Sequence, residues 1–425
     1  MSRLNEMLHE LCPAGVEYVG FGTVCDYIRG VTYNKSQEAK PNEANPVKVL
    51  RANNITLGFN TLNFDDIKLV SKDVKVKNVQ KLTANDILIC AGSGSKEHIG
   101  KVAYIDKDID CTFGGFMGVI RCRQENLSPR YLFHILTSGI FLNYLRTALN
   151  SSTINNLNNQ VMNGFWFPLP PLPIQHEIVR ILDAFTSLTA ELTAELTAEL
   201  TARKRQYAYY RDRLLTFGDD VPRVRLGEVA VSFYRGSGIK REQVTEVGVP
   251  CVRYGEIYTA YNTSFEDCVS RTRMEYVSNP KFFEYGDILF AITGESVDDI
   301  AKSIAYVGHE KCLAGGDIVV MKHRQNPKYL AHVLNTTTSR EQKAKGRVKS
   351  KVVHSNVPSI EKIEIPLPPL EEQERLASLL DRFDALCNNL TDGLPAEIAA
   401  RKKQYAYYRD KLLTFETGDT DKELK

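Results

Sequence analysis

Two short segments carry side chains that are suited to pairing with the edges of nucleic-acid bases. Arg51, Asn53 and Asn54 offer a guanidinium and carboxamides, the groups that bond guanine and adenine in a bidentate manner. A similar segment in the C-terminal half of the chain offers Arg253, Tyr254 and Glu256. Such residues also serve ordinary turn chemistry, so each has a structural as well as a base-reading interpretation.

Further loops indicate the same chemistry. A glycine-rich loop after the strand predicted at 85–89 holds Ser93, Lys96 and His98, and its counterpart in the second half holds Thr293 and Glu295. Between residues 340 and 351 the chain carries a run of cations with few acids nearby, namely Lys343, Arg347, Lys349 and Lys351. The run suits phosphate contacts, and an exposed basic loop without a ligand is the alternative.

Catalytic signatures are absent from the sequence. It has no phosphate-binding loop G-x-x-x-x-G-K-[ST] and no N-P-P-[YF], the motif with which amino-methyltransferases hold a target base. The segment Phe113–Gly118 has the glycines of a cofactor loop, but Gly315–Gly316 repeats its glycine pair, which favours a shared structural turn. Nine scattered cysteines and eight histidines without ligand spacing predict neither disulfides nor a metal site.

Composition predicts a soluble globular protein of two to four domains, with 425 residues, 43% of them hydrophobic and 25% charged. No apolar run approaches the roughly 18 residues of a membrane span, and the first residues lack the apolar core of a signal peptide. We therefore expect a cytoplasmic protein that has no membrane partner. The net charge of +2 is neutral evidence on DNA binding, because it does not say where the charges lie.

A long internal repeat sets the elements that must position these loops. Phe167–Leu172 returns as Ile365–Leu370, and Arg203–Asp212 returns as Arg401–Asp410, at a constant offset of 198 residues. Apolar residues at steps of three and four predict one helix face in each copy. A continuous helix from about 174 to 217 would be roughly 65 Å long and needs a partner for its apolar stripe. We predict that the two copies form an antiparallel, coiled-coil-like pair.

The two copies differ in their middle. The first holds three consecutive T-A-E-L units, from Thr189 to Leu200. Each unit adds about 6 Å and about 40° of helix, against about 3.4 Å and 35° for one base pair of B-DNA. We interpret the units as a ruler between two DNA-bound modules, with a low-complexity helical spacer as the alternative. In the second copy, Gly393 and Pro395 should kink or interrupt the helix.

The Q-Y-x-Y-Y-R-D stretch of each copy is aromatic and basic, as protein interfaces tend to be. It predicts a surface that docks another subunit twice, through Tyr207, Tyr210, Arg211, Tyr405, Tyr408 and Arg409. Tyrosines that pack helices, flanked by solvated charges, are the alternative.

The blocks between the repeats share a faint skeleton of mixed strands and one short helix. Asn85–Ile89 corresponds to Gly286–Phe290, and Pro129–Leu132 corresponds to Pro327–Leu330. The predicted fold class is α+β and pseudo-twofold: two homologous globular domains separated by two long antiparallel helices. The domains span 1–155 and 218–355, and the helical segments span 156–217 and 356–425.

This organisation resembles the specificity subunits (HsdS) of type I restriction-modification systems over essentially the whole chain. The resemblance rests on the P-L-P-P-L entry, the G-D-I-L strand at Gly286–Leu289, the Q-Y-x-Y-Y-R-D tract and the alternation of two domains with two helices. Asn85 replaces the glycine of G-D-I-L in the first copy. The T-A-E-L run is similar to the subgroup in which spacer repeats set the gap of the target.

The resemblance implies a non-catalytic reader of double-stranded DNA, in which each domain binds one half of an asymmetric bipartite site. The helices would set the spacing and dock two methylation subunits, which carry S-adenosylmethionine, and restriction subunits that use ATP and Mg²⁺ would join them. No cofactor is expected on this chain, which would direct adenine methylation and restriction alike. The alternatives are a stand-alone DNA methyltransferase or nuclease, and a coiled-coil scaffold without a DNA role.

Overall fold

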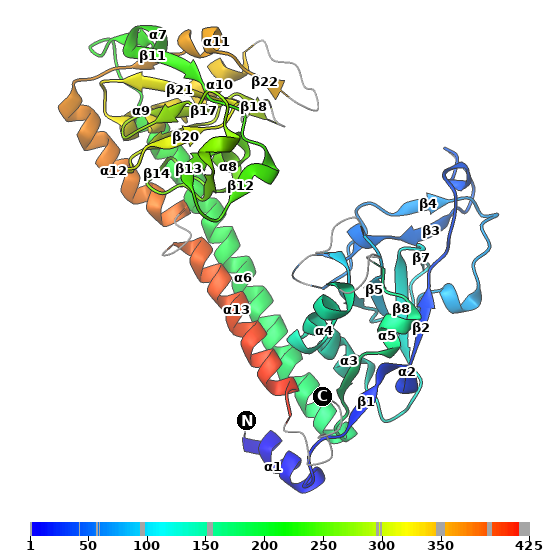
Figure 1. Cartoon of the computed structure of the whole chain (residues 1–425). Helices are drawn as coiled ribbons and strands as arrows, with labels where there is room; N and C mark the ends of the chain where they lie inside the picture. The colour runs from blue at the N-terminus through cyan, green and yellow to red at the C-terminus, as the bar shows by residue number, and fades with distance from the viewer. Residues whose placement is uncertain are drawn as a thin grey trace. The chain divides into compact units, whose positions relative to one another are not determined.

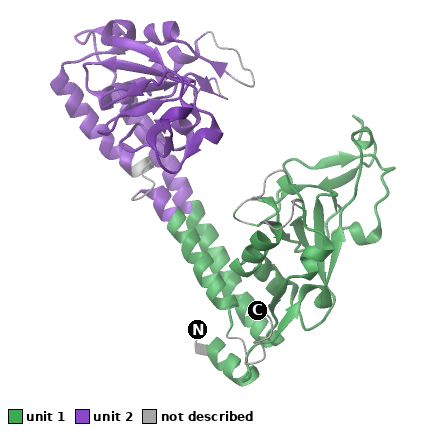
Figure 2. Ribbon diagram, in the orientation of Figure 1, with its two compact units in different colours: residues 1–194, 399–425 green, residues 195–398 purple. Residues whose placement is uncertain are grey.

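The computed structural model describes residues 2–41, 43–56, 58, 60–93, 98–150, 156–294, 297, 300–345, 353–388 and 393–415. The chain forms two compact units, shown in Figure 2. Unit 1 contains residues 1–194 and 399–425, and unit 2 contains residues 195–398. Each unit therefore combines one of the divergent blocks with parts of both repeated tracts.

Unit 1 holds a main antiparallel sheet, a smaller mixed sheet and a strand pair. The main sheet has the order β2 (Cys25–Arg29), β8 (Met117–Cys122), β5 (Ile87–Cys90) and β6 (Val102–Tyr104). The mixed sheet has the order β4 (Lys68–Val70), β3 (Val47–Leu50) and β7 (Thr112–Phe113), with β3 and β7 parallel. The pair joins β1 (Tyr18–Gly20) to β9 (Trp166–Pro168). The helices of this block are α1 (Ser2–Leu11), α2 (Phe21–Val24), α3 (Pro129–Thr137), α4 (Gly139–Asn150) and α5 (Asn159–Asn163).

Unit 2 repeats this plan with longer sheets. Its main sheet has the order β11 (Ala230–Arg235), β21 (Ile318–His323), β17 (Ile288–Ala291), β19 (Ser303–Tyr306) and β14 (Ser264–Phe265). Its second sheet has the order β12 (Val244–Thr245), β15 (Ser270–Thr272), β13 (Val249–Val252), β20 (Cys312–Ala314) and β16 (Phe282–Phe283). Here β13 and β20 are parallel, like β3 and β7 in unit 1.

Two strand pairs and five short helices complete unit 2. The pairs join β10 (Arg223–Arg225) to β23 (Glu364–Pro366) and β18 (Thr293–Gly294) to β22 (Val353–His354). The helices are α7 (Leu226–Val229), α8 (Tyr254–Thr259), α9 (Pro327–Leu334), α10 (Thr337–Ala344) and α11 (Val357–Glu361).

The long helices behave as their sequences predict (Figure 1). The first is one continuous helix, α6 (Leu172–Leu214), of 43 residues. The second is divided into α12 (Leu370–Asn388) and α13 (Leu394–Leu413). The carbonyl of Gly393 accepts the amides of Ala396 and Glu397 at 3.0 and 3.2 Å, so a new helix starts there, with Pro395 in its first turn, where a missing amide costs nothing.

Contacts inside each unit confirm the antiparallel pair and its pseudo-twofold symmetry. In unit 1, Phe185 of α6 stacks on Tyr408 of α13, with ring centroids 6.3 Å apart. In unit 2, Phe383 of α12 stacks on Tyr210 of α6, again at 6.3 Å. The two pairs are the same residues of the repeat with the copies exchanged.

Each globular domain is held on a helix by one equivalent set of polar contacts, in which only the histidine is fully buried. In unit 1, Asp183 of α6 accepts hydrogen bonds from Arg130 and His134 of α3, the latter at 2.8 Å. In unit 2, Asp381 of α12 bonds to Lys328 and His332 of α9, at 2.7 and 2.8 Å. The sequence explains why α3 and α9 start where they do, because each begins with a proline behind a capping side chain, Ser128 or Asn326.

A second equivalent contact joins each short helix to the proline-rich entry of the long one. The hydroxyl of Tyr131 donates to the carbonyl of Pro168 at 2.9 Å, and that of Tyr329 donates to Pro366 at 2.9 Å. Both tyrosines are fully buried. Their loss would leave a buried carbonyl without a partner.

We expect Tyr131→Phe and Tyr329→Phe to lower the free energy of unfolding by about 1–2 kcal/mol each, because each removes one buried hydrogen bond and leaves the ring in place. Tyr285→Phe is the matched control, since Tyr285 is exposed, and it should change nothing measurable. Calorimetric melting of the full chain measures all three. Equal stability of all three variants and the parent would show that these bonds do not hold the domains.

Candidate nucleic-acid interface

The same glycine turn lies beside a pocket in each unit. In unit 1, Gly114 forms a parallel bridge with Val31, and in unit 2, Gly315 forms one with Ser237. An arginine at the end of the adjacent strand clamps each turn. Arg29 donates to the carbonyl of Gly115 at 2.6 Å, and Arg235 donates to the carbonyl of Gly316 at 2.5 Å. The prediction of a shared structural turn at these glycine pairs is confirmed.

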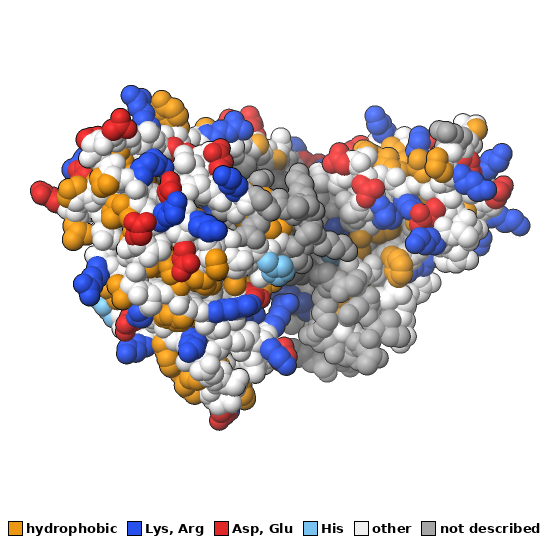
Figure 3. Space-filling model, turned by 90° about the horizontal axis from the view of Figure 1, so that it is seen from above, with side chains coloured by type: hydrophobic (Ala, Val, Ile, Leu, Met, Phe, Trp, Pro, Cys, Tyr) orange, Lys and Arg blue, Asp and Glu red, His pale blue; other side chains and the backbone are white. Residues whose placement is uncertain are grey.

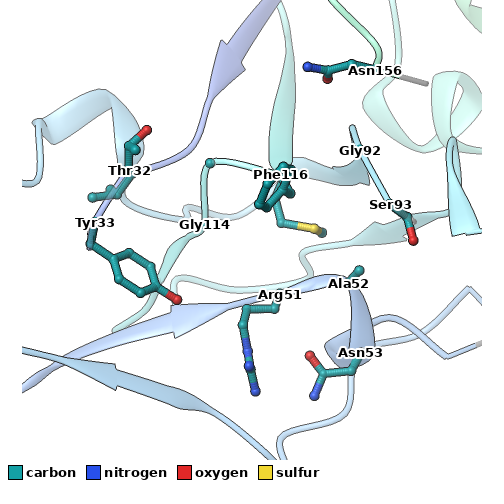
Figure 4. A pocket seen from close by; sticks show the side chains of 13 residues that line it. Thr32, Tyr33, Arg51, Ala52, Asn53, Gly92, Ser93, Gly114, Phe116 and Asn156 are labelled. Carbon is teal, nitrogen blue, oxygen red and sulfur yellow. The ribbon is translucent and has the colours of Figure 1, made fainter. Parts of the chain in front are cut away.

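The pocket of unit 1 has a volume of about 900 Å³. It combines apolar and polar walls, which include Tyr33, Arg51, Asn53, Ser93, Phe116 and Asn156 (Figure 4). Arg51 and Asn53 follow strand β3, and Phe116 follows the Gly114–Gly115 turn. Phe116 is 73% exposed, the largest value among the Phe, Tyr and Trp residues that the structure describes.

The pocket of unit 2 occupies the equivalent place and is smaller, about 480 Å³. Its walls are more charged and include Arg235, Lys240, Arg253, Tyr254 and Asp317. Asp317 stands where unit 1 has Phe116, and its carboxylate pairs with Arg235 at 2.5 Å. Two pockets thus share one frame and differ in the side chains that they present.

The equivalent arginines of the two pockets have different carboxylate partners. In unit 1, Arg51 and Asn53 both donate to the exposed carboxylate of Asp66, at 2.8 and 3.0 Å. In unit 2, Arg253 donates through Nε and Nη2 to the buried carboxylate of Glu256, at 2.8 and 2.6 Å. An exposed ion pair is weak and easily exchanged for another acceptor, whereas a buried one is not. Arg51 is therefore the more available of the two.

Three of the residues named for base reading are engaged inside the fold. The fully buried side chain of Asn54 accepts the amide of Arg51 at 2.8 Å, and the buried Glu256 accepts the amide of Arg253 at 2.9 Å. Thr293 is buried and bonds to the Nδ1 atom of His354 at 3.1 Å. Capping of a helical turn, the structural alternative, explains the first two directly.

Lys343 corrects the expectation of an exposed basic run. Its ammonium lies inside unit 2 and donates to the hydroxyl of Ser303 at 2.9 Å and to the carbonyl of Leu334 at 2.7 Å. Sequence reasoning missed this because it counted charges, whereas position 343 lies on the inner face of α10. The equivalent residue in unit 1 is Leu145, which is also buried. An apolar residue at the equivalent position of the first block is the signal that could have revealed the burial of Lys343.

Of the other residues predicted to contact DNA, some belong to the described part of the chain and some do not. Ser93 lines the pocket of unit 1, and Tyr254 lines that of unit 2. His98 is partly buried. Outside the described residues lie Lys96, Glu295, Arg347, Lys349 and Lys351.

The candidate docking residues are mostly turned inward. Tyr207, Arg211 and Arg409 are buried, and the hydroxyl of Tyr207 bonds to Nδ1 of His332 at 2.9 Å. Tyr405 is half-buried and bonds to Thr186 at 2.8 Å. Helix packing therefore accounts for these four, while Tyr210 and Tyr408 stay partly exposed although each stacks on a phenylalanine.

The most exposed aromatic residues of the tract are two tyrosines that were not among the predicted docking residues. Tyr209 and Tyr407 are 59% and 61% exposed, at equivalent positions of the two copies. Helical phase could have found them, because the tyrosine between two inward-facing positions must face outward.

The described part of the chain contains no cluster of His, Cys, Asp and Glu side chains able to hold a metal ion. Within the same part, no helix has the length and apolar character to cross a membrane. On the face seen in Figure 3, lysine and arginine side chains are interspersed with acidic ones. This face therefore presents no extended field of one sign.

Fold and pockets define a class of protein: two homologous α+β domains, each holding a differently lined pocket and each mounted on a shared pair of long helices. The family model described as type I restriction modification DNA specificity domain matches the chain twice, at residues 13–202 and 219–400. The chain belongs to this family.

Relatives and solved structures agree with this assignment. A type I restriction enzyme specificity subunit from Haemophilus influenzae is 32% identical over 308 residues, which are 69% of this chain and 74% of the relative. The EcoR124I/EcoR124II specificity subunit of Escherichia coli is 35% identical over 257 residues, 60% of this chain and 62% of the relative. A chain from a structural study of type I R-M complex assembly and conformational transition has the same fold, with a TM-score of 0.63 at 17% identity, over 94% of this chain and 97% of that one.

Burial of Lys343 has a consequence for stability. Removal from water is the main cause that lowers the pKa of its ammonium from 10.5 to about 7, and the positive charges of Arg340 and Arg211 act in the same direction. Between these two pH values the unfolded chain holds a proton that the folded chain lacks, so stability rises with pH across this window. Below about pH 7 the Lys343 ammonium is charged in the folded unit as well, and both of its hydrogen-bond partners are neutral. The full free-energy cost of burying this charge then lowers the stability of the fold.

We expect Lys343→Met to raise the melting temperature of unit 2 at pH 7 and to flatten its pH dependence between pH 7 and 10, with a gain of at least about 1 kcal/mol. Lys345→Met is the control, because Lys345 is exposed and two residues away. Calorimetry over this pH range measures both. A destabilised Lys343→Met variant would mean that the two hydrogen bonds outweigh the cost of burial.

Proposed function

We propose that the chain is the sequence-reading subunit of a type I restriction-modification complex. Each recognition domain reads one half of a bipartite site in double-stranded DNA, and the chain directs methylation and restriction by partner subunits without catalysing either. The observation that carries the proposal is the pair of equivalent pockets, built on one frame and lined by different side chains. Two such readers suit a target with two unlike halves, and the similarity to specificity subunits of type I restriction enzymes supports the same role.

The T-A-E-L units act as the spacer in this proposal. They lie in α6 between Leu182, which belongs to the core of unit 1, and Tyr207, which belongs to the core of unit 2. Both anchor points are fixed by burial, so inserted helix residues change the rise and phase between them. One unit corresponds to about 6 Å and 40°.

The pair of exposed tyrosines, Tyr209 and Tyr407, supports docking of two copies of one partner. They are equivalent in the repeat, and exposed aromatic side chains beside basic ones are typical of interface anchors. We assign the two methylation subunits to these sites. The restriction subunits would join that assembly. S-adenosylmethionine, ATP and Mg²⁺ would bind to the partner subunits. The complex would be located in the cytoplasm.

Deleting Thr193–Leu196 should shorten the gap between the half-sites by one or two base pairs, because about 6 Å and 40° of helix are lost. Both half-site sequences should stay as they are. Mapping methylated adenines across a genome measures gap and half-sites together. Glu195→Gln keeps the helix length and should keep the gap, and an added T-A-E-L unit should lengthen it. A changed half-site, or an unchanged gap in an active deletion variant, would contradict the ruler.

Tyr209→Ala and Tyr407→Ala together should weaken binding of the methylation subunits about tenfold or more, because each removes an exposed aromatic anchor. The fold should be unaffected, since both side chains face solvent. Size-exclusion chromatography with the partner subunit measures the stoichiometry. Each single variant should retain one of two subunits. Tyr285→Ala, at an exposed tyrosine of the recognition domain, is the control, and undiminished assembly of the double variant would place docking elsewhere.

A further inference from the structure

We propose that Phe116 makes the unit 1 domain specific for a thymine, by packing its ring on the 5-methyl group in the major groove. The inference rests on the proposed DNA-reading function and names one contact within it. Phe116 has no counterpart of the same chemistry in unit 2, where Asp317 takes its place.

Hydrogen bonds hold the backbone of Phe116, whereas its side chain is exposed to solvent. Its carbonyl accepts the amides of Ala91 and Gly92, at 2.9 and 3.0 Å, and the preceding carbonyl, of Gly115, is clamped by Arg29. The residue is nevertheless 73% exposed. A large apolar side chain held in water by a rigid backbone loses little conformational entropy on binding and gains from covering its surface.

The surroundings of Phe116 indicate a base edge as the apolar partner. The ring shares its pocket with Arg51 and Asn53, which are hydrogen-bond donors (Figure 4). The Nε atom of Arg51 is buried and has no acceptor among the described residues. Thymine shows an apolar methyl next to the acceptor O4 in the major groove, and no base shows such a pair in the minor groove.

The place of the ring favours contact with a base edge over insertion between base pairs. Phe116 forms part of the wall of a pocket of about 900 Å³ and does not stand alone on a convex surface. A wedge must protrude far enough to separate stacked bases. A ring in a pocket wall can instead cover a methyl group that enters the pocket.

Unit 2 provides an internal comparison. The carbonyl of Asp317 accepts the amide of Ile292 at 3.0 Å, as that of Phe116 accepts Ala91 and Gly92, so the two side chains leave equivalent backbones. The carboxylate of Asp317 is paired with Arg235 and offers no apolar surface. Sensitivity to a thymine methyl at this contact should therefore belong to one half-site alone.

The test uses the full chain in complex with its methylation subunits and duplexes that carry its mapped target site. Each thymine of both half-sites is replaced in turn by uracil, which lacks only the 5-methyl group. At one position of one half-site, uracil should weaken binding by the wild-type complex roughly threefold to fivefold, the value of one buried methyl group. Phe116→Ala should bind the thymine and uracil duplexes equally at that position and respond like wild type elsewhere.

Two further variants separate the contact from a structural effect. Phe64→Ala removes an exposed phenylalanine, 49% exposed, of the same unit outside the pocket, and should keep the wild-type uracil pattern. Phe116→Leu should keep a sensitivity to the methyl group, because an apolar side chain remains. If Phe116→Ala lowered binding uniformly, the Leu variant would still report on the contact.

The outcomes distinguish this inference from the function on which it rests. Uracil that costs the same in wild type and Phe116→Ala at every position, or half-sites without any methyl-sensitive thymine, would overturn the contact while leaving sequence-specific reading intact. Wild-type complex without preference among DNA sequences would overturn the proposed function and the contact together.

Discussion

A half-buried carboxylate on a long helix, bonded to a buried histidine, holds each recognition domain in place. Asp183 and Asp381 each accept a histidine of a short domain helix, and both histidines are almost fully buried. Burial alone would raise the pKa of Asp183, but hydrogen bonds from His134 and Arg130 outweigh it and lower the pKa. Breaking this contact is costly because the histidine nitrogen would be left without a partner inside the fold. The pocket of each domain is consequently carried rigidly by a helix.

The attachment of each domain to a long helix explains which parts of the two units are alike and which differ. Contacts between domain and helix keep their chemistry across the repeat, down to the tyrosine hydroxyl on a proline carbonyl. Around this frame the chemistry varies. Tyr207 bonds to Nδ1 of His332, whereas its counterpart Tyr405 bonds to Thr186 and leaves Nδ1 of His134 without a partner among the described residues. The turn beside the pocket changes most, from an apolar ring to a carboxylate.

Much of the architecture could be read from the sequence because it depends on periodicity. Helical steps of three and four predict α6 and its partner, and the repeat at a constant offset predicts that the copies pair. Gly393 and Pro395 predict the division between α12 and α13, since both residues act on the backbone itself. Turn glycines repeated in both blocks predict a shared structural turn. These features rest on local stereochemistry, which a linear pattern contains.

Which polar side chains face solvent was decided only by the tertiary structure. Lys343 belongs to a basic run in the sequence but lies inside unit 2, and Asn54 and Glu256 close helical turns in place of facing a ligand. In the sequence, Phe116 is only one residue of a glycine-rich segment, yet the fold leaves it exposed in the pocket that Arg51 also lines. The sequence by itself determined the repeat, the long helices and the family. Direction and burial of single side chains depend on strands and helices that meet from distant parts of the chain, so the three-dimensional packing alone decided them.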